Sequence, residues 1–378
     1  MSILNYGRQQ ITEDDEKAIL EALKSDYLTQ GPLISQFEKM VAKHHGAKYA
    51  VLFNSGTAAL HSSFHALGVE KEDEVIVPAI TFAASGNGAI YNGGKIVLAD
   101  IDLNTSCIDI DNIDNYITDK TKVITPVSMG GYPVHLERLR GKVKDKDIKI
   151  LYDAAHSISS KRDGSFGMEH IDIAILSFHP VKHITTGEGG MALTNDKEYY
   201  EEMLLFRNHG ITKDPSFYDN KEPWYYEMIS LGYHYRMPDL LASLGISQFK
   251  RIEENISRRN EIAEMYYSSL QGLDFLELPP IVDYDNKDTV HSYHLFQLKI
   301  DPQKRLRFYE YMRENKIMCQ IHYVPMHFHK FYRDMFGYKQ GDFEKAEEFY
   351  SKTISIPMYH DLKNEEVLYI IDTIKKFK

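Results

Sequence analysis

The segment 177–190, Ser-Phe-His-Pro-Val-Lys-His-Ile-Thr-Thr-Gly-Glu-Gly-Gly, joins two short apolar runs at residues 173–176 and 190–193. A strand is expected to end at Ser177, a turn at Pro180 follows, and the glycine-rich end reverses the chain into a second strand. Lys182 lies inside this connection, where largely apolar surroundings can lower its pKa and make it a nucleophile and base. A solvated loop lysine is the alternative that this stretch alone leaves open.

Outward from this segment, short apolar and β-branched runs alternate with helical patterns. Strands are predicted at residues 49–53, 74–77, 95–98, 122–125, 148–152, 173–176 and 190–193. Residues 57–67 carry apolar side chains at helical spacing. The alternation predicts an α/β fold with a mostly parallel sheet that is covered by helices.

A second, smaller unit is predicted after a long helix at residues 239–270. Its pattern indicates a strand at 293–300, a helix at 305–315, a strand at 317–321 and two later helices. We therefore expect a large domain over residues 1–240, and a linking helix with a small α+β domain over residues 241–378. The acidic, tyrosine-rich residues 214–228 are expected to form an insertion or a mobile loop.

Composition excludes several classes of protein. The 378 residues include 44 Lys+Arg and 55 Asp+Glu, so the formal net charge is −11 and nucleic acid is not expected as a partner. No window approaches the roughly 18 apolar residues of a membrane span, and the N-terminal residues lack the apolar core of a signal peptide. Two cysteines, Cys107 and Cys319, are too few for a disulfide scaffold. We expect a cytoplasmic globular protein without membrane partners, most often an enzyme at this length.

Two further features precede the lysine. Asp153 follows the predicted strand at 148–152, and the carboxyl end of a parallel strand faces the crevice where such sheets bind ligands. An Asp at such a junction is also a common helix cap. Residues 54–57, Asn-Ser-Gly-Thr, join a strand to a helix, where amide groups and a hydroxyl suit a phosphate. Each feature is weak alone, but a phosphate cradle, an acid and a lysine occur together in one chain.

The order and context of these features resemble the fold-type I pyridoxal-phosphate enzymes and, more narrowly, the DegT/StrS family of sugar-nucleotide aminotransferases. The resemblance covers nearly the whole chain and includes residues 27–32, 78–82, 207–210 and 321–325. The Ser-Phe-x-Pro-x-Lys core and Gly-Glu-Gly-Gly are specific in combination. The resemblance implies an aminotransferase with a large domain that binds pyridoxal 5'-phosphate, held as a covalent aldimine on Lys182.

The resemblance also implies roles for individual positions. Lys182 would shuttle the proton, and Asp153 would pair with the pyridinium nitrogen of the cofactor. Phe82 would stack on the cofactor ring, and His156 would lie near its hydroxyl. The phosphate would be held by Ser55, Gly56, Thr57 and Ser177, together with His234 of the partner subunit. In relatives that last position, within Gly-Tyr-x-Tyr-Arg, is Asn, and the arrangement implies a homodimer with shared active sites.

The substrate side is implied in the same way. Segments that embrace a nucleotide-linked sugar in relatives correspond to Tyr6, Asp26, Tyr27, Leu28, Thr29, His322, Tyr323, Val324, Pro325 and His327. Residues 177–190 resemble the subgroup that makes UDP-4-amino-4,6-dideoxy-N-acetyl-β-L-altrosamine for pseudaminic acid, although His183 replaces an expected Pro. A UDP-linked 4-keto-6-deoxy-N-acetylhexosamine and L-glutamate are the expected substrates.

Other functions are open on the sequence alone. Different 4-keto nucleotide sugars, of the bacillosamine, legionaminic acid or perosamine type, are alternative acceptors. A sugar dehydratase on the same scaffold is disfavoured because such family members carry His at the position of Lys182. A non-catalytic homologue that retains the fold is a third alternative. No metal is expected, because the histidines near His327 lack a further ligand in fixed geometry.

Overall fold

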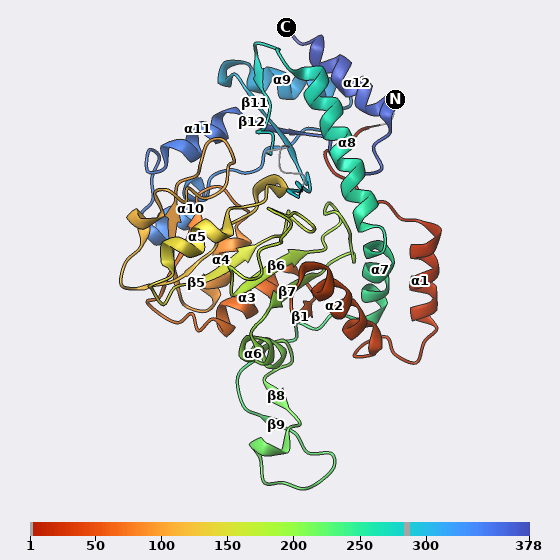
Figure 1. The fold of residues 1–378 in the computed structure, drawn as a ribbon, viewed down its shortest axis with the longest axis vertical. Helices are drawn as coiled ribbons and strands as arrows, with labels where there is room; N and C mark the ends of the chain where they lie inside the picture. The colour runs from red at the N-terminus through yellow and green to blue at the C-terminus, as the bar shows by residue number, and fades with distance from the viewer. Residues whose placement is uncertain (1–2, 283–287) are drawn as a thin grey trace.

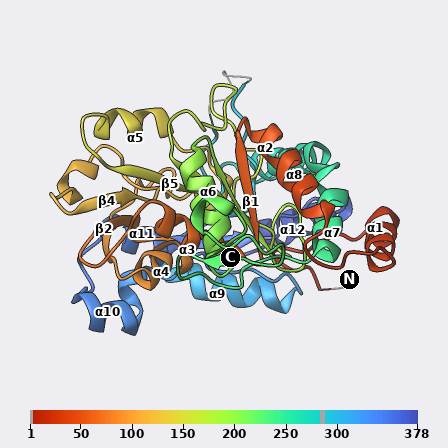
Figure 2. The ribbon, with the colours of Figure 1, turned by 90° about the horizontal axis from the view of Figure 1, so that it is seen from below.

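The computed structural model describes residues 3–282 and 288–378, and it confirms the predicted fold class. A seven-stranded sheet of order β1-β7-β6-β5-β4-β2-β3 lies among helices in the larger part of the molecule (Figures 1 and 2). Its strands are β1 (Tyr49–Phe53), β2 (Glu74–Pro78), β3 (Lys95–Ala99), β4 (Thr121–Ile124), β5 (Lys149–Asp153), β6 (Ile173–Ser177) and β7 (Gly190–Thr194). Only β7 runs antiparallel to its neighbours, β1 and β6. All seven strands lie where the apolar runs predict them.

The helices of this part lie within the first 210 residues of the chain. They are α1 (Glu13–Leu23), α2 (Pro32–His45), α3 (Gly56–Ala66), α4 (Ala84–Tyr91), α5 (Leu136–Val143) and α6 (Lys197–Arg207). Two short strands, β8 (Ile211–Thr212) and β9 (Glu227–Met228), then pair in an arm that projects from the molecule at the bottom of Figure 1. The predicted insertion at residues 214–228 makes up most of this arm. Among the described residues, no helix has both the length and the apolar character that a bilayer span requires.

The C-terminal part contains a three-stranded antiparallel sheet of order β10-β11-β12. Its elements are α7 (Asp239–Phe249), α8 (Ile252–Leu270), β10 (Leu276–Glu277), β11 (Phe296–Ile300), α9 (Pro302–Glu314), α10 (Lys330–Phe336), α11 (Glu344–Lys352), β12 (Thr353–Ile356) and α12 (Asn364–Lys375). Three predictions are wrong here. The helix expected over 239–270 is two helices, the strand expected at 317–321 makes only isolated bridges with Leu4 and Ser355, and three helices follow it.

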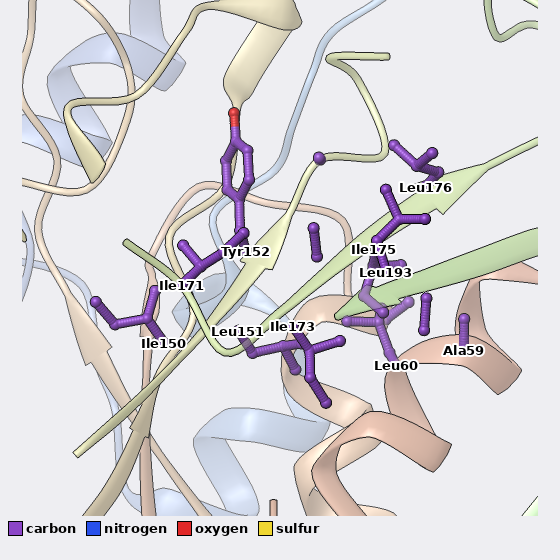
Figure 3. Close-up of a cluster of buried hydrophobic side chains, with 14 of the residues drawn as sticks. Ala59, Leu60, Ile150, Leu151, Tyr152, Ile171, Ile173, Ile175, Leu176 and Leu193 are labelled. Atoms are coloured by element: carbon purple, nitrogen blue, oxygen red, sulfur yellow. The ribbon is translucent and has the colours of Figure 1, made fainter. Parts of the chain in front are cut away.

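Two groups of buried apolar side chains form the core. The larger group surrounds the seven-stranded sheet, and Figure 3 shows a part of it, with Leu60 of α3 beside Ile175 and Leu193. The smaller group gathers Leu4 with side chains of α8, α9, α12, β11 and β12. Helix α8 contributes to both, with Ile256 in the first group and Ile262 in the second. The domain boundary expected near residue 240 stays a prediction.

Strand β7 brings two glycines into close contact. In the strand register Gly190 lies opposite both Phe53 and Ser177. A Cβ atom on Gly190 would lie 2.5 Å from the Cα and the backbone nitrogen of Gly56, at the first turn of α3. Only glycine at position 190 allows the N-terminus of α3 to rest on the sheet at this point. The contact places the start of α3 beside the end of β6.

We predict that Gly190→Ala destabilises the protein by about 1–3 kcal/mol, because the added methyl group must push α3 away from the sheet. Urea denaturation followed by circular dichroism measures the effect. Gly141→Ala is the matched control: a Cβ there has no atom within 4 Å, and alanine favours the helix α5 by up to about 1 kcal/mol. Equal midpoints for the two variants would contradict the prediction.

Candidate active site

A cavity of about 530 Å³ opens at the carboxyl ends of β1, β2, β5 and β6. Several residues that the sequence predicts for the site line it together: Tyr6, Ser55, Gly56, Thr57, Phe82, Asp153, His156, Ser177, Lys182, His322 and Tyr323. The cavity is also lined by residues that the sequence reasoning missed, including Thr81, Ser85, His179, Glu188 and Gln320. The topology therefore gathers side chains that are more than 300 positions apart in the chain.

Asp153 ends strand β5 and is buried at the base of the cavity. Its Oδ2 accepts a hydrogen bond of 2.6 Å from the Ser85 hydroxyl, and its Oδ1 accepts one of 3.1 Å from the backbone N–H of Ala155. Burial raises the pKa of this carboxyl above its usual value, although the two hydrogen bonds and the charge of Lys182 oppose the shift. These hydrogen bonds hold the carboxyl group of Asp153 in place. A cationic N–H donor in the cavity would stabilise its charged form.

Ser85 supports this arrangement from helix α4. Its hydroxyl lies 2.7 Å from that of Thr81, four positions earlier, so the two hydroxyls form a short chain that ends on Asp153. No sequence motif predicts that Ser85 supports Asp153. The one available signal is that Thr81 and Ser85 are four positions apart.

Lys182 lies in the connection between β6 and β7, on the same cavity as Asp153. Burial lowers the pKa of its ammonium group to about 7, and the Asp153 carboxylate acts in the opposite direction. A lysine with this pKa has a large fraction of free amine at neutral pH, which is the nucleophilic form. This supports the reactive-lysine interpretation over that of a solvated loop residue.

The N-terminus of α3 forms the third side of the cavity. Ser55 caps the helix, because its hydroxyl accepts a hydrogen bond of 3.1 Å from the backbone N–H of Ala58. Gly56 and Thr57 follow in the first turn, and Ser177 lies directly beside Gly56. The free N–H groups and positive dipole end of a helix favour an anion such as phosphate.

Aromatic side chains form another wall of the cavity. The ring centroids of Tyr6 and His322 are 5.1 Å apart, and those of Phe82 and Tyr323 are 6.0 Å apart. Phe82 is 60% exposed, so one face of its ring is free to cover a planar group. Tyr6 is held by the C-terminal part, since its carbonyl accepts a hydrogen bond of 3.0 Å from the N–H of Met358.

The remaining predicted residues lie outside this cavity. Asp26, Tyr27, Leu28 and Thr29 are exposed between α1 and α2, and Val324, Pro325 and His234 also do not line it. The backbone carbonyl of His234 does approach the cradle, 3.5 Å from the side-chain nitrogen of Asn54. His327 is fully buried, and its Nε2 lies 3.0 Å from the Glu347 carboxylate, so it packs against α11 instead of facing the cavity. Within the described residues, no cluster of three His, Cys, Asp or Glu side chains could hold a metal ion.

Comparison with known proteins shows the family to which the chain belongs. The sequence profile of the DegT/DnrJ/EryC1/StrS aminotransferase family matches residues 9–375. The chain belongs to this family. An uncharacterized protein of Methanocaldococcus jannaschii is 38% identical over 99% of this chain and 97% of its own length. A UDP-4-amino-4,6-dideoxy-N-acetyl-beta-L-altrosamine transaminase of Campylobacter jejuni (strain 81-176) is 32% identical over 98% of this chain and 96% of its own.

A solved structure supports the cofactor as well as the fold. The pyridoxal-phosphate form of the putative sugar aminotransferase Spr1654 from Streptococcus pneumoniae superposes with a TM-score of 0.90, at 29% identity over 99% of this chain and 98% of that chain. This protein is thus a pyridoxal-phosphate-dependent aminotransferase that acts on nucleotide sugars, as its membership of the family indicates.

The residues of the cavity fit pyridoxal phosphate. The buried Asp153 carboxyl suits the ring nitrogen, the free amine of Lys182 suits the aldehyde, and the N-terminus of α3 suits the phosphate. His156 is buried on the same cavity, and its Nδ1 has no hydrogen-bond partner among the described residues. Each part of the cofactor therefore has a group of matching chemistry.

We predict that the apoenzyme reacts with aldehydes in a pH-dependent way. Because the pKa of Lys182 is lowered to about 7, the free-amine fraction increases as the pH rises through about 7. The rate of covalent trapping by pyridoxal and cyanoborohydride, followed by mass spectrometry, should have its midpoint there. Lys182→Ala is the control for reaction at other lysines. A midpoint near the ordinary lysine pKa of about 10 would contradict the prediction.

Proposed function

We propose that this protein transfers the amino group of L-glutamate to the C4 ketone of a UDP-linked 4-keto-6-deoxy-N-acetylhexosamine, in the synthesis of pseudaminic acid. The observation that carries the proposal is the shared cavity of Lys182, Asp153 and the α3 N-terminus, in a chain 32% identical to an altrosamine transaminase. The segment 177–190 supports the same subgroup. The presence of a lysine at position 182 disfavours a dehydratase, since family members of that type carry His there.

Each half-reaction moves a proton, and Lys182 is the group that we assign to it. When bound, the cofactor supplies the electron sink that stores the amino group between glutamate and the sugar. The Nζ of Lys182 would hold the cofactor, and the same amine, once free, would accept the proton and return it. Asp153 would keep the ring nitrogen of the cofactor protonated, while Phe82 would cover the ring and exclude water from that face. Ser55, Gly56, Thr57 and Ser177 hold the phosphate.

We further propose that two copies of the chain share their active sites, with His234 of the partner subunit near the phosphate. The arm and the segment that follows it support an interface, because Trp224 and Leu231 are 71% and 72% exposed. Residues 26–29 are also exposed, and they lie outside the cavity. If they bind the sugar, either the partner subunit or the bound substrate must bring them into contact with it. The two cysteines are buried free thiols, which agrees with the reducing cytoplasm as the site of action.

Replacing Asp153 tests the proposed role of the carboxylate. Asp153→Asn should lower kcat for amino transfer by about 100-fold or more, because an amide carries no charge to hold the ring nitrogen protonated. Ser85→Ala is a milder companion: it removes one hydrogen bond to Asp153 and should cost less than about 10-fold. Steady-state kinetics with glutamate measure both. Asp153→Asn with a kcat within about two-fold of the wild type would contradict this role.

The substrate is tested with a panel of UDP-, dTDP- and GDP-linked 4-keto sugars, with glutamate as donor and mass spectrometry of the products. We expect gain of nitrogen on the UDP-linked, L-configured N-acetyl ketone, and no product with Lys182→Ala. Preference for a GDP-linked ketone would overturn the proposal and indicate a perosamine-type enzyme. Loss of a hydroxyl without gain of nitrogen would indicate a dehydratase, and cofactor binding without turnover would indicate a non-catalytic homologue.

A further inference from the structure

Three buried histidines, His156, His183 and His294, form a cluster at the cavity, which His156 lines. His156 follows β5, His183 directly follows Lys182, and His294 precedes β11 in the C-terminal part. The ring centroids of His156 and His294 are 4.3 Å apart, and those of His183 and His294 are 5.6 Å apart. No member is more than 4% exposed. The histidine cluster therefore connects the lysine loop and the cofactor cavity with a segment more than 100 residues further along the chain.

Hydrogen bonds fix the two outer members of the cluster through Ser292. The Nε2 of His183 lies 2.9 Å from the carbonyl oxygen of Ser292. Because a carbonyl oxygen only accepts hydrogen bonds, this Nε2 carries the hydrogen. The hydroxyl of Ser292 in turn donates a hydrogen bond of 2.9 Å to the carbonyl of His156. Ser292 thus links the backbone of His156 to the ring of His183 through two hydrogen bonds.

The ring of His156 depends on packing for its orientation. Its Nε2 lies 3.2 Å from the Tyr323 hydroxyl, whereas its Nδ1 is buried without a hydrogen-bond partner among the described residues. One hydrogen bond does not by itself fix the rotation of an imidazole ring about its Cβ–Cγ bond. The ring of His294 packs against that of His156, with the two ring centroids 4.3 Å apart and their planes inclined by 48°.

The surroundings of the cluster disfavour positive charge. Burial lowers the pKa of all three histidines well below the usual value. The charges of Lys182 and Arg259 act in the same direction, and Arg259 is itself fully buried, where it donates to the carbonyls of Tyr293 and Met358. The cluster is therefore uncharged at neutral pH and adds no cation beside the reactive lysine.

We propose that His294 and His183 are positioning residues, which hold the ring of His156 in the orientation that faces the bound cofactor. This inference rests on the proposed placement of His156 beside the cofactor ring. His294 acts by direct ring packing. His183 acts through its hydrogen bond to Ser292, which fixes the backbone that carries His294.

The first test compares two replacements of His294 by titrating the apoenzyme with pyridoxal phosphate and recording absorbance and fluorescence. His294→Ala removes the ring and should weaken cofactor binding about 10-fold, within the range for residues in contact. It should also shift the pH at which the absorbance of the bound cofactor changes. His294→Phe retains the packing and should match the wild type within about two-fold. Wild-type binding by His294→Ala, or equal weakening by both variants, would overturn the role of ring packing.

A double-mutant cycle separates positioning from a general structural effect. If His294 acts through His156, His294→Ala should add no further loss of cofactor affinity in a His156→Ala background. The same loss in both backgrounds would overturn the proposal. Circular dichroism of each apoprotein establishes that it is folded, and His294→Leu replaces His294→Ala in the cycle if the alanine variant does not fold.

His183 is tested with a matched pair of variants. His183→Gln retains an N–H donor for the Ser292 carbonyl and should bind the cofactor as the wild type does. His183→Leu lacks this donor and should bind about three-fold more weakly. Equal affinities for the two would overturn the role of His183. A different sugar preference in the substrate panel would contradict the proposed function instead, and would leave these binding constants unchanged.

Discussion

The antiparallel direction of β7 is the constraint on which the site depends. A parallel strand after β6 would need a crossover that returns the chain to the opposite edge of the sheet. Because β7 runs against β6, their connection stays at the carboxyl edge, where β5 ends in Asp153. Lys182 therefore lies on the same cavity as the carboxylate. The same strand carries Gly190, whose lack of a side chain lets α3 bring its N-terminus to that edge. One reversal of direction thus places the lysine, the acid and the phosphate cradle together.

The charge of the whole chain does not describe this cavity. The protein carries a formal net charge of −11, yet its cofactor and its substrate are both phosphate-bearing anions. The α3 N-terminus compensates for this at short range, because it offers N–H donors and a positive dipole end to a phosphate. Lys182 and Asp153 line the same cavity. Burial opposes charge on both, since it raises the pKa of the acid and lowers that of the amine. The cationic ring nitrogen of a bound cofactor would stabilise the charged form of Asp153. Its electrophilic carbon would react with the neutral amine of Lys182.

Local sequence patterns predicted the strands that are buried along their whole length. They failed for features that depend on contacts between residues far apart in the chain. Short β-branched runs predicted all seven strands of the large sheet, because strands buried on both faces need apolar side chains throughout. The sequence pattern did not reveal the break between α7 and α8, because the apolar spacing continues through Ile252. Helix α8 contributes side chains to both core groups.

At the site, motifs singled out Lys182 and Asp153, and the structure places both on one cavity. Ser85 and His294 carry no motif, because their roles depend on contacts with residues 68 and 138 positions away. The contact of His327 with Glu347 was not foreseen, because Glu347 lies on a helix that the pattern near His327 does not reveal, and a sugar-facing role for His327 stays a prediction.

The position of Tyr6 has a consequence for the order of events during synthesis. Its side chain lines the cavity, but its segment is held by residues that are made much later: Leu4 pairs with Ile317, and the carbonyl of Tyr6 accepts a hydrogen bond from the N–H of Met358. A nascent chain that has emerged only as far as Lys182 and the seven-stranded sheet lacks this wall, together with His322 and Tyr323. The cofactor cavity is therefore finished only after the ribosome has released the C-terminal part. Two segments that lie far apart in the chain, around Tyr6 and around Met358, therefore close the site together.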